Sequence, residues 1–223
     1  MNIIRFLPNT LTLLNGFSGC MALLSLFEND YNKTLMWVLI GVFLDSIDGL
    51  VARAFLVSSE IGKQLDSLCD VISFGLVPGY FMHKYLNDFL PYEFVPLSIL
   101  AFVVTLASIF RLARFNITPS SQLDFHGMPT PAFALFVVGI PFIPFEINSI
   151  IITVVVALLT LLMVSKIMLP SQKFVNGKPS NFFWLFAVIF IPVLLIFRSQ
   201  ALSLTVLDYA FFGILYKIGR AHV

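Results

Sequence analysis

Four aspartates between residues 45 and 70 stand in surroundings that are poor for charge: Asp45, Asp48, Asp66 and Asp70. Residues 35–44 before them and 71–80 after them are almost wholly apolar. An ionised carboxylate at membrane depth costs several kcal/mol unless it is paired, bound to a metal or in contact with water. Four such groups in one short stretch therefore indicate a functional site.

The spacing of these aspartates predicts how they meet. In a helix, Asp45 and Asp48 (i, i+3) share one face, and Asp66 and Asp70 (i, i+4) share a face on a second helix. Two such helices facing each other would gather four carboxylates around one small volume. Carboxylate oxygens without His or Cys nearby suit Mg²⁺, Mn²⁺ or Ca²⁺ rather than zinc.

The residues beside the aspartates suit a phosphate-bearing ligand. Gly49 and Ala52 leave the face of Asp45 and Asp48 without bulk, so a ligand can approach the backbone closely. Arg53 is always charged and offers a fork that matches phosphate oxygens.

Together these residues form the pattern D-x2-D-G-x2-A-R-x8-G-x3-D-x3-D, which resembles the signature of the CDP-alcohol phosphotransferases. The resemblance implies transfer of a group from a CDP-linked lipid, with release of CMP. It also implies that Asp45, Asp48 and Asp66 are metal ligands for one or two Mg²⁺ or Mn²⁺ ions, and that Asp70 is the general base and also approaches the metal. The residues it implies for the CDP-lipid site are Asn15, Gly49, Ala52, Arg53 and Gly62.

Three further segments, 73–78, 110–116 and 125–131, resemble the CDP-diacylglycerol–serine O-phosphatidyltransferases, and this likeness covers residues 9–131. It implies that CDP-diacylglycerol and L-serine react to give phosphatidylserine and CMP. Arg111 and Arg114, three positions apart on one helix face, could pair with the serine carboxylate. The alternative for both arginines is anchoring at a helix end or binding of lipid phosphate.

Other functions stay open at this point. A sister enzyme could use glycerol 3-phosphate or inositol phosphate as acceptor, or an archaeal ether-linked lipid as donor. Membrane carboxylates could also line a divalent-cation channel or transporter. The channel hypothesis leaves Gly49, Ala52, Arg53 and Gly62 unexplained.

The composition predicts an all-α integral membrane protein. Of 223 residues, 59% are hydrophobic and 11% charged, against about 45–50% and about 25% in soluble domains. We expect a single membrane domain over 1–223, with a catalytic core at 9–131 and additional transmembrane helices at 149–218. About eight spans fit the apolar runs, at 9–27, 34–55, 65–86, 93–110, 132–145, 149–169, 181–197 and 202–218.

Several local features follow from this span assignment. Asn9 is expected to cap the first span, residues 58–62 to connect the second to the third, and Arg111 and Arg114 to emerge after the fourth. The two cysteines, Cys20 and Cys69, are expected to be reduced core residues. No cleavable signal peptide is evident.

Charge predicts the orientation in the membrane. With eight spans, ten Lys and Arg residues fall on one side and three on the other, namely Lys33, Lys84 and Arg198. Cationic loops favour the cytoplasm, so we expect both termini and the active site to face the cytosol, in a multi-pass protein of the cell membrane. The net charge of +1 gives no support for a nucleic-acid partner. Membrane lipids are expected partners, and the family resemblance implies a homodimer.

Overall fold

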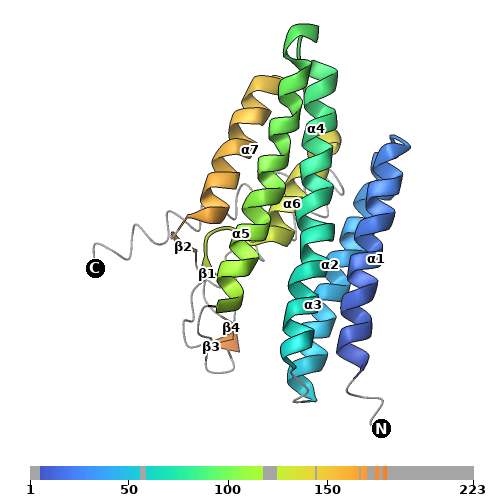
Figure 1. Cartoon of the computed structure of the whole chain (residues 1–223), viewed down its shortest axis with the longest axis vertical. Helices are drawn as coiled ribbons and strands as arrows, with labels where there is room; N and C mark the ends of the chain where they lie inside the picture. The colour runs from blue at the N-terminus through green and yellow to red at the C-terminus, as the bar shows by residue number, and fades with distance from the viewer. Residues whose placement is uncertain are drawn as a thin grey trace. The chain divides into compact units, whose positions relative to one another are not determined.

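The computed structural model describes residues 6–55, 59–117, 125–143, 145–165, 167–169, 174–175 and 178–179. The chain divides into two compact units, Met1–Thr118 and Pro119–Val223. Each unit is described by itself below (Figure 1).

The first unit begins with two apolar helices joined by a short turn, α1 (Leu7–Phe27) and α2 (Tyr31–Ala54). Asn29 closes the turn with a positive φ of 62°, a conformation that asparagine tolerates better than most residues. The Asp30 carboxylate accepts a hydrogen bond from the Lys33 N–H at 3.0 Å, and this bond lowers the pKa of Asp30. Because the turn is so short, α1 and α2 are antiparallel neighbours that pack along their length (Figure 1).

The next three elements form one continuous helical rod: α3 (Glu60–Asp70), the π-helical segment η2 (Val71–Leu76) and α4 (Val77–Phe89). Ser59 caps its start, because its hydroxyl accepts a hydrogen bond from the Gly62 N–H at 3.0 Å. Gly62 therefore lies in the first turn of α3, and the prediction that it belongs to the connection is wrong.

A 3₁₀ segment, η3 (Tyr92–Phe102), leads into α5 (Val103–Ile117). The expectation that this span ends at Phe110 is wrong, because helix-favouring residues continue without Gly or Pro to Ile117. Arg111 and Arg114 consequently lie within the helix and do not emerge after it.

Small residues on α1 set how closely it approaches the rod. A Cβ on Gly16 would lie 2.8 Å from Cys69 Sγ, and one on Gly19 would lie 2.8 Å from the Cα of Ser73. The two glycines thus serve helix packing.

Both cysteines are free thiols, but Cys20 is exposed, so its prediction as a core residue is wrong, whereas Cys69 is buried.

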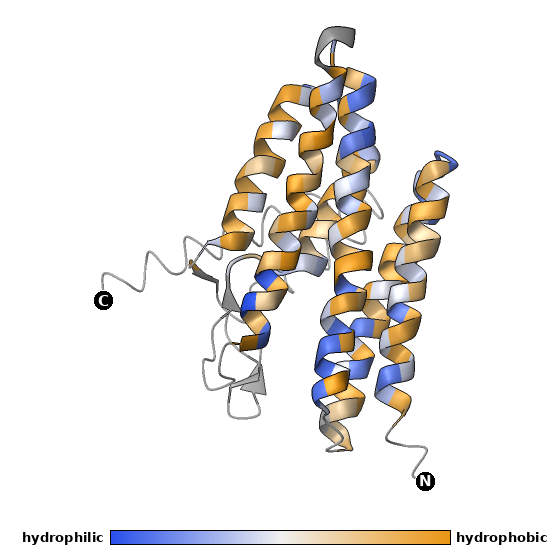
Figure 2. Cartoon of the chain, viewed as in Figure 1, coloured by the Kyte–Doolittle hydropathy of each residue, from blue (hydrophilic) through white to orange (hydrophobic). Residues whose placement is uncertain are grey.

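Four helices of this unit are long and apolar enough to cross a membrane: Leu7–Phe27, Tyr31–Ala52, Glu60–Phe89 and Val95–Ile117. Figure 2 shows apolar residues along most of their length, with hydrophilic residues gathered where α1 and α3 begin and where α4 and α5 end. Many large apolar side chains face outward, including Phe17, Phe43 and Leu106. These features identify a membrane protein.

The second unit contains α6 (Thr130–Val138), a 3₁₀ turn η4 (Ile140–Phe142) and α7 (Ser149–Val164). Two antiparallel strand pairs accompany them: β1 (Phe125–His126) with β2 (Met168–Leu169), and β3 (Phe174–Val175) with β4 (Lys178–Pro179). Over the described residues, the fold is thus helical apart from these short pairs.

The predicted fifth and sixth spans are shorter than expected. α6 ends at Val138, since Gly139 and Pro141 follow, and the predicted span 132–145 is therefore broken. α7 has 16 residues and stops at Val164 rather than residue 169. The predicted seventh and eighth spans, 181–197 and 202–218, lie outside the described residues.

Candidate active site

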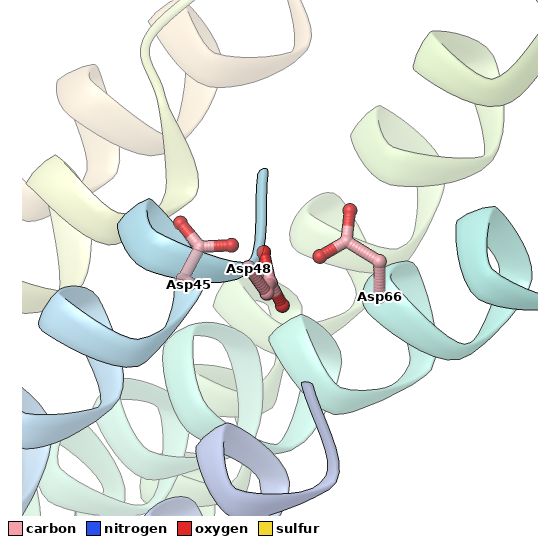
Figure 3. A group of neighbouring side chains, drawn as sticks. All are labelled: Asp45, Asp48 and Asp66. Carbon is pink, nitrogen blue, oxygen red and sulfur yellow. The ribbon is translucent and has the colours of Figure 1, made fainter. Parts of the chain in front are cut away.

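Three of the four predicted metal ligands come together where α2 faces α3. Asp45 and Asp48 project from α2 and Asp66 from α3, and each offers a carboxylate oxygen within 4.8 Å of the others (Figure 3). We call these three residues the acidic trio. Their convergence follows from the i, i+3 spacing on α2 and from α1, which packs against both α2 and α3.

Asp70 lies one helical turn beyond Asp66 on α3 and is 7% exposed. Among the described residues, it is not a member of the group whose ligand atoms lie within 4.8 Å of one another. Its Oδ1 accepts a hydrogen bond from Asn15 Nδ2 at 3.0 Å. Asp70 is thus held from α1 by the Asn15 amide.

Asp48 also contacts α1. The Thr12 hydroxyl donates to Asp48 Oδ2 at 2.5 Å, and both residues are buried. The sequence reasoning missed Thr12. The available signal was its place three residues before Asn15, which puts two donors on one face of α1.

A pocket of about 250 Å³ opens beside these carboxylates. Five motif residues line it, and five others complete its wall. The motif residues are Asp48, Gly49, Ala52, Gly62 and Asp66, and the others are Pro8, Asn9, Thr12, Ser59 and Lys63. The pocket therefore lies between the starts of α1 and α3 and the final turns of α2.

Only some of the residues predicted to bind the CDP-lipid line the described pocket. Gly49, Ala52 and Gly62 line the pocket, whereas Asn15 does not and instead contacts Asp70. The Arg53 side chain lies outside the described part of the structure. Because α1 starts at Leu7, with Phe6 in the cap position, the prediction that Asn9 is the cap is wrong. Asn9 faces Gly62, where a Cβ would lie 2.9 Å from Asn9 Oδ1.

The two arginines predicted to bind serine lie on α5. Arg111 is buried and Arg114 half-buried, and neither is among the described residues that line the pocket. The last turn of α5 is nevertheless tied to α3. Lys63 Nζ donates to the Asn116 carbonyl oxygen at 2.5 Å, and Asn116 Nδ2 donates to Ser67 Oγ at 2.9 Å.

The acidic trio suits a divalent cation. Its donors are carboxylate oxygens, which hard ions such as Mg²⁺ and Mn²⁺ prefer. Three carboxylates so close together among apolar helices repel one another, and a bound cation would offset that repulsion. The residues present therefore fit the metal that the motif implies.

The fold and the pocket define a class: a helical membrane protein with an acidic pocket near the end of its spans. The profile of the CDP-alcohol phosphatidyltransferase family matches residues 5–165. The chain belongs to this family, which confirms the prediction from the motif, and is a transferase of phospholipid biosynthesis.

Curated relatives are similar over much of their length. The CDP-diacylglycerol–serine O-phosphatidyltransferase of Bacillus subtilis is 30% identical over 169 residues, covering 76% of this chain and 92% of the relative. The enzyme of the same name from Methanocaldococcus jannaschii is 35% identical over 208 residues, covering 93% and 92%. The archaetidylserine synthase of Methanothermobacter thermautotrophicus is 34% identical over 131 residues, covering 58% and 54%.

Proposed function

We propose that this chain transfers the phosphatidyl group of CDP-diacylglycerol to the hydroxyl of L-serine, giving phosphatidylserine and CMP, in a reaction that depends on Mg²⁺ or Mn²⁺. The observation that carries the proposal is the pocket, because five residues of one eight-position motif line it from two helices, and two of them, Asp48 and Asp66, belong to the acidic trio. A cation channel would need neither the small pocket residues nor their fixed spacing.

The pocket binds the CDP head group of the donor. Gly49, Ala52 and Gly62 line the pocket with no side chain or only a methyl group, so the diphosphate can lie against the helix backbones. Lys63 supplies a positive charge to the described wall, and Asn9 and Ser59 supply hydrogen-bonding groups. Arg53 adds a second cation by its place in the motif.

Asp45, Asp48 and Asp66 are the residues that would hold the divalent ion. When bound, the ion neutralises diphosphate charge and stabilises the charge that develops on the departing phosphate oxygen. Thr12 orients Asp48 toward this role through its hydrogen bond.

Asp70 accepts the proton of the attacking hydroxyl. The serine oxygen forms a bond to the lipid-side phosphorus while the bond from that phosphorus to CMP breaks, and CMP leaves with the electron pair. Asp70 suits the base role because it is buried, lies outside the acidic trio and has one oxygen held by Asn15.

Serine is the acceptor that the comparisons favour. Relatives with a diacylglycerol donor and one named an archaetidylserine synthase share serine in their names. Arg111 and Arg114 supply two cations on one face of α5 for the serine carboxylate. The hydrogen bonds from α3 to Asn116 hold that helix beside the pocket.

The site faces the cytosol, with both termini on that side, in a homodimer embedded in the cell membrane. Support comes from charge, because Lys63, Arg111 and Arg114 lie at the same ends of their helices as the pocket. The rod Glu60–Phe89 has 30 residues, a length of about 45 Å. It is long enough to carry Asp66 into the head-group region of one leaflet.

An acceptor and donor panel tests this function. Purified protein receives CDP-diacylglycerol or its archaeal ether analogue with Mg²⁺ or Mn²⁺, and either serine, glycerol 3-phosphate or inositol phosphate. We expect CMP release and a lipid product of phosphatidylserine mass with serine alone. A product formed with a phosphorylated acceptor and not with serine would overturn the assignment of serine. Preference for the ether donor would change the assigned donor to an archaeal lipid.

A further inference from the structure

Asn15 has an unusual position for a polar side chain in an apolar helix. It lies in the first half of α1, is completely buried and does not line the pocket. Its Nδ2 donates to Asp70 Oδ1 at 3.0 Å, across 55 positions of sequence. The contact joins a helix without any motif residue to the proposed base.

The backbone of Asn15 is fixed to the same rod. Its carbonyl oxygen accepts hydrogen bonds from the hydroxyls of Ser18 at 2.6 Å and Ser73 at 2.9 Å. Ser73 lies three residues after Asp70, so α1 contacts the rod through the Asn15 side chain at Asp70 and through its backbone at Ser73. The close approach of Gly16 to Cys69 and of Gly19 to Ser73 leaves little room for this arrangement to shift.

The amide of Asn15 is only half satisfied. Its Oδ1 is buried and finds no hydrogen-bond partner among the described residues. A buried acceptor without a partner lowers stability, and an apolar residue of similar size would avoid that loss. An asparagine that is unfavourable for packing and yet donates to Asp70 points to a role in the site rather than in the fold.

The rod itself changes geometry at Asp70. The π-helical segment η2 begins at the next residue, Val71. Such segments are rare and frequently occur at functional sites. Thr105 Oγ1 on α5 donates to the Gly75 carbonyl at 3.0 Å, so η2 is held from α5 as well as from α1.

We propose that Asn15 is the positioning residue of Asp70. Its neutral amide holds one carboxylate oxygen in place without cancelling the charge, and the other oxygen remains to accept the proton of the acceptor hydroxyl. The inference rests on the proposed base role of Asp70. The positioning role takes the place of the CDP-lipid contact that the sequence predicts for Asn15.

The test compares Asn15→Leu with the wild type in CMP release. We expect kcat to fall about tenfold or more, the scale of a lost hydrogen bond to a charged group. The KM for CDP-diacylglycerol and the half-saturating Mg²⁺ concentration stay within about twofold. Ser25→Ala is the matched control, since this α1 hydroxyl donates to the Met21 carbonyl of its own helix, and it should behave as wild type.

Two variants test the positioning role of Asn15 separately from the base role of Asp70. An active Asp70→Asn enzyme would remove the base role itself. Loss of activity in Asp70→Asn with an unchanged kcat in Asn15→Leu would overturn only the positioning role. A raised donor KM with normal kcat in Asn15→Leu would return Asn15 to the CDP-lipid site.

A second pair of variants decides the matter if Asn15→Leu does not fold. Asn15→Asp places two carboxylates together and should lower the Tm. Combining it with Asp70→Asn restores an amide–carboxylate pair in reverse and should recover the Tm, while activity stays absent because the carboxylate has moved to α1. Failure of the double variant to recover the Tm, or recovery of activity, would contradict the pairing we propose.

Discussion

At the scale of single residues, helix α1 supplies a hydrogen-bond donor to each of two carboxylates. Thr12 donates to Asp48 and Asn15 donates to Asp70. Because the two donors lie three positions apart, one face of α1 contacts a member of the acidic trio and the proposed base. Side chains that are held by such contacts lose less freedom when a metal or substrate binds.

Thr12→Val should weaken metal binding. The substitution keeps the shape of the side chain but removes the donor to Asp48, so we expect the half-saturating Mg²⁺ concentration to rise about tenfold. Thr10→Val is the control, because that exposed hydroxyl donates to the nearby Phe6 carbonyl. Equal metal dependence of the two variants in CMP release would show that Thr12 does not orient Asp48.

Arg111→Lys should weaken the binding of serine more than the binding of CDP-diacylglycerol. Lysine keeps the charge but loses the planar fork that grips a carboxylate, so the KM for serine should rise by about tenfold with little change in the KM for CDP-diacylglycerol. Steady-state kinetics with each substrate varied in turn measures both constants. The reverse pattern would assign Arg111 to the lipid phosphate.

Residue spacing predicted part of this site and could not predict the rest. The i, i+3 pair on α2 and the motif gave the acidic trio, because helix geometry alone places such residues on one face. The separate place of Asp70 depends on how α1 packs against α3, which spacing does not encode. Thr12 stayed hidden because a threonine in an apolar helix ordinarily bonds the carbonyl four residues back, as it also does here to Pro8.

At the scale of elements, the close contact of α1 with the rod positions the site. Gly16 and Gly19 allow this contact, because neither has a Cβ. Helix ends were less predictable, because Asn9 and Gly62 are common boundary residues that here lie inside first turns. The broken fifth span follows from Gly139 and Pro141, which end α6 at Val138 within a short apolar run.

Gly19→Ala should disturb the fold and the site together. The new Cβ would lie 2.5 Å from Ser73 Oγ and 2.9 Å from its backbone nitrogen, so α1 must move away from η2. We expect a loss of about 1–3 kcal/mol in stability and a lower kcat. Cys20→Ala, at the exposed neighbouring position, is the control. Wild-type Tm and kcat in Gly19→Ala would show that the contact is not tight.

At the scale of the whole molecule, the four apolar helices of the first unit have two distinct ends. One end carries the pocket, Lys63 and the arginines of α5. The other carries the turn at residues 28–30 and the Asp30–Lys33 ion pair. The excess of cations near the pocket predicts that this end faces the cytosol.

Thiol labelling of membrane vesicles measures that orientation. In a Cys20→Ala, Cys69→Ala background that retains activity, Glu60→Cys should react with an impermeant reagent only in inside-out vesicles. Glu28→Cys, at the opposite end, should react only in right-side-out vesicles. Both positions are exposed in the structure. The opposite labelling pattern would place the pocket outside the cell.

The proposed reaction requires that Asp45, Asp48 and Asp66 jointly hold a divalent ion beside the pocket. Mn²⁺ binding to the purified protein, followed by electron paramagnetic resonance, tests it most directly. We predict that the wild type binds Mn²⁺, that Asp45→Asn, Asp48→Asn and Asp66→Asn each weaken binding by tenfold or more, and that Glu146→Gln does not. Unchanged Mn²⁺ affinity in all three aspartate variants, with the proteins folded, would contradict the claim.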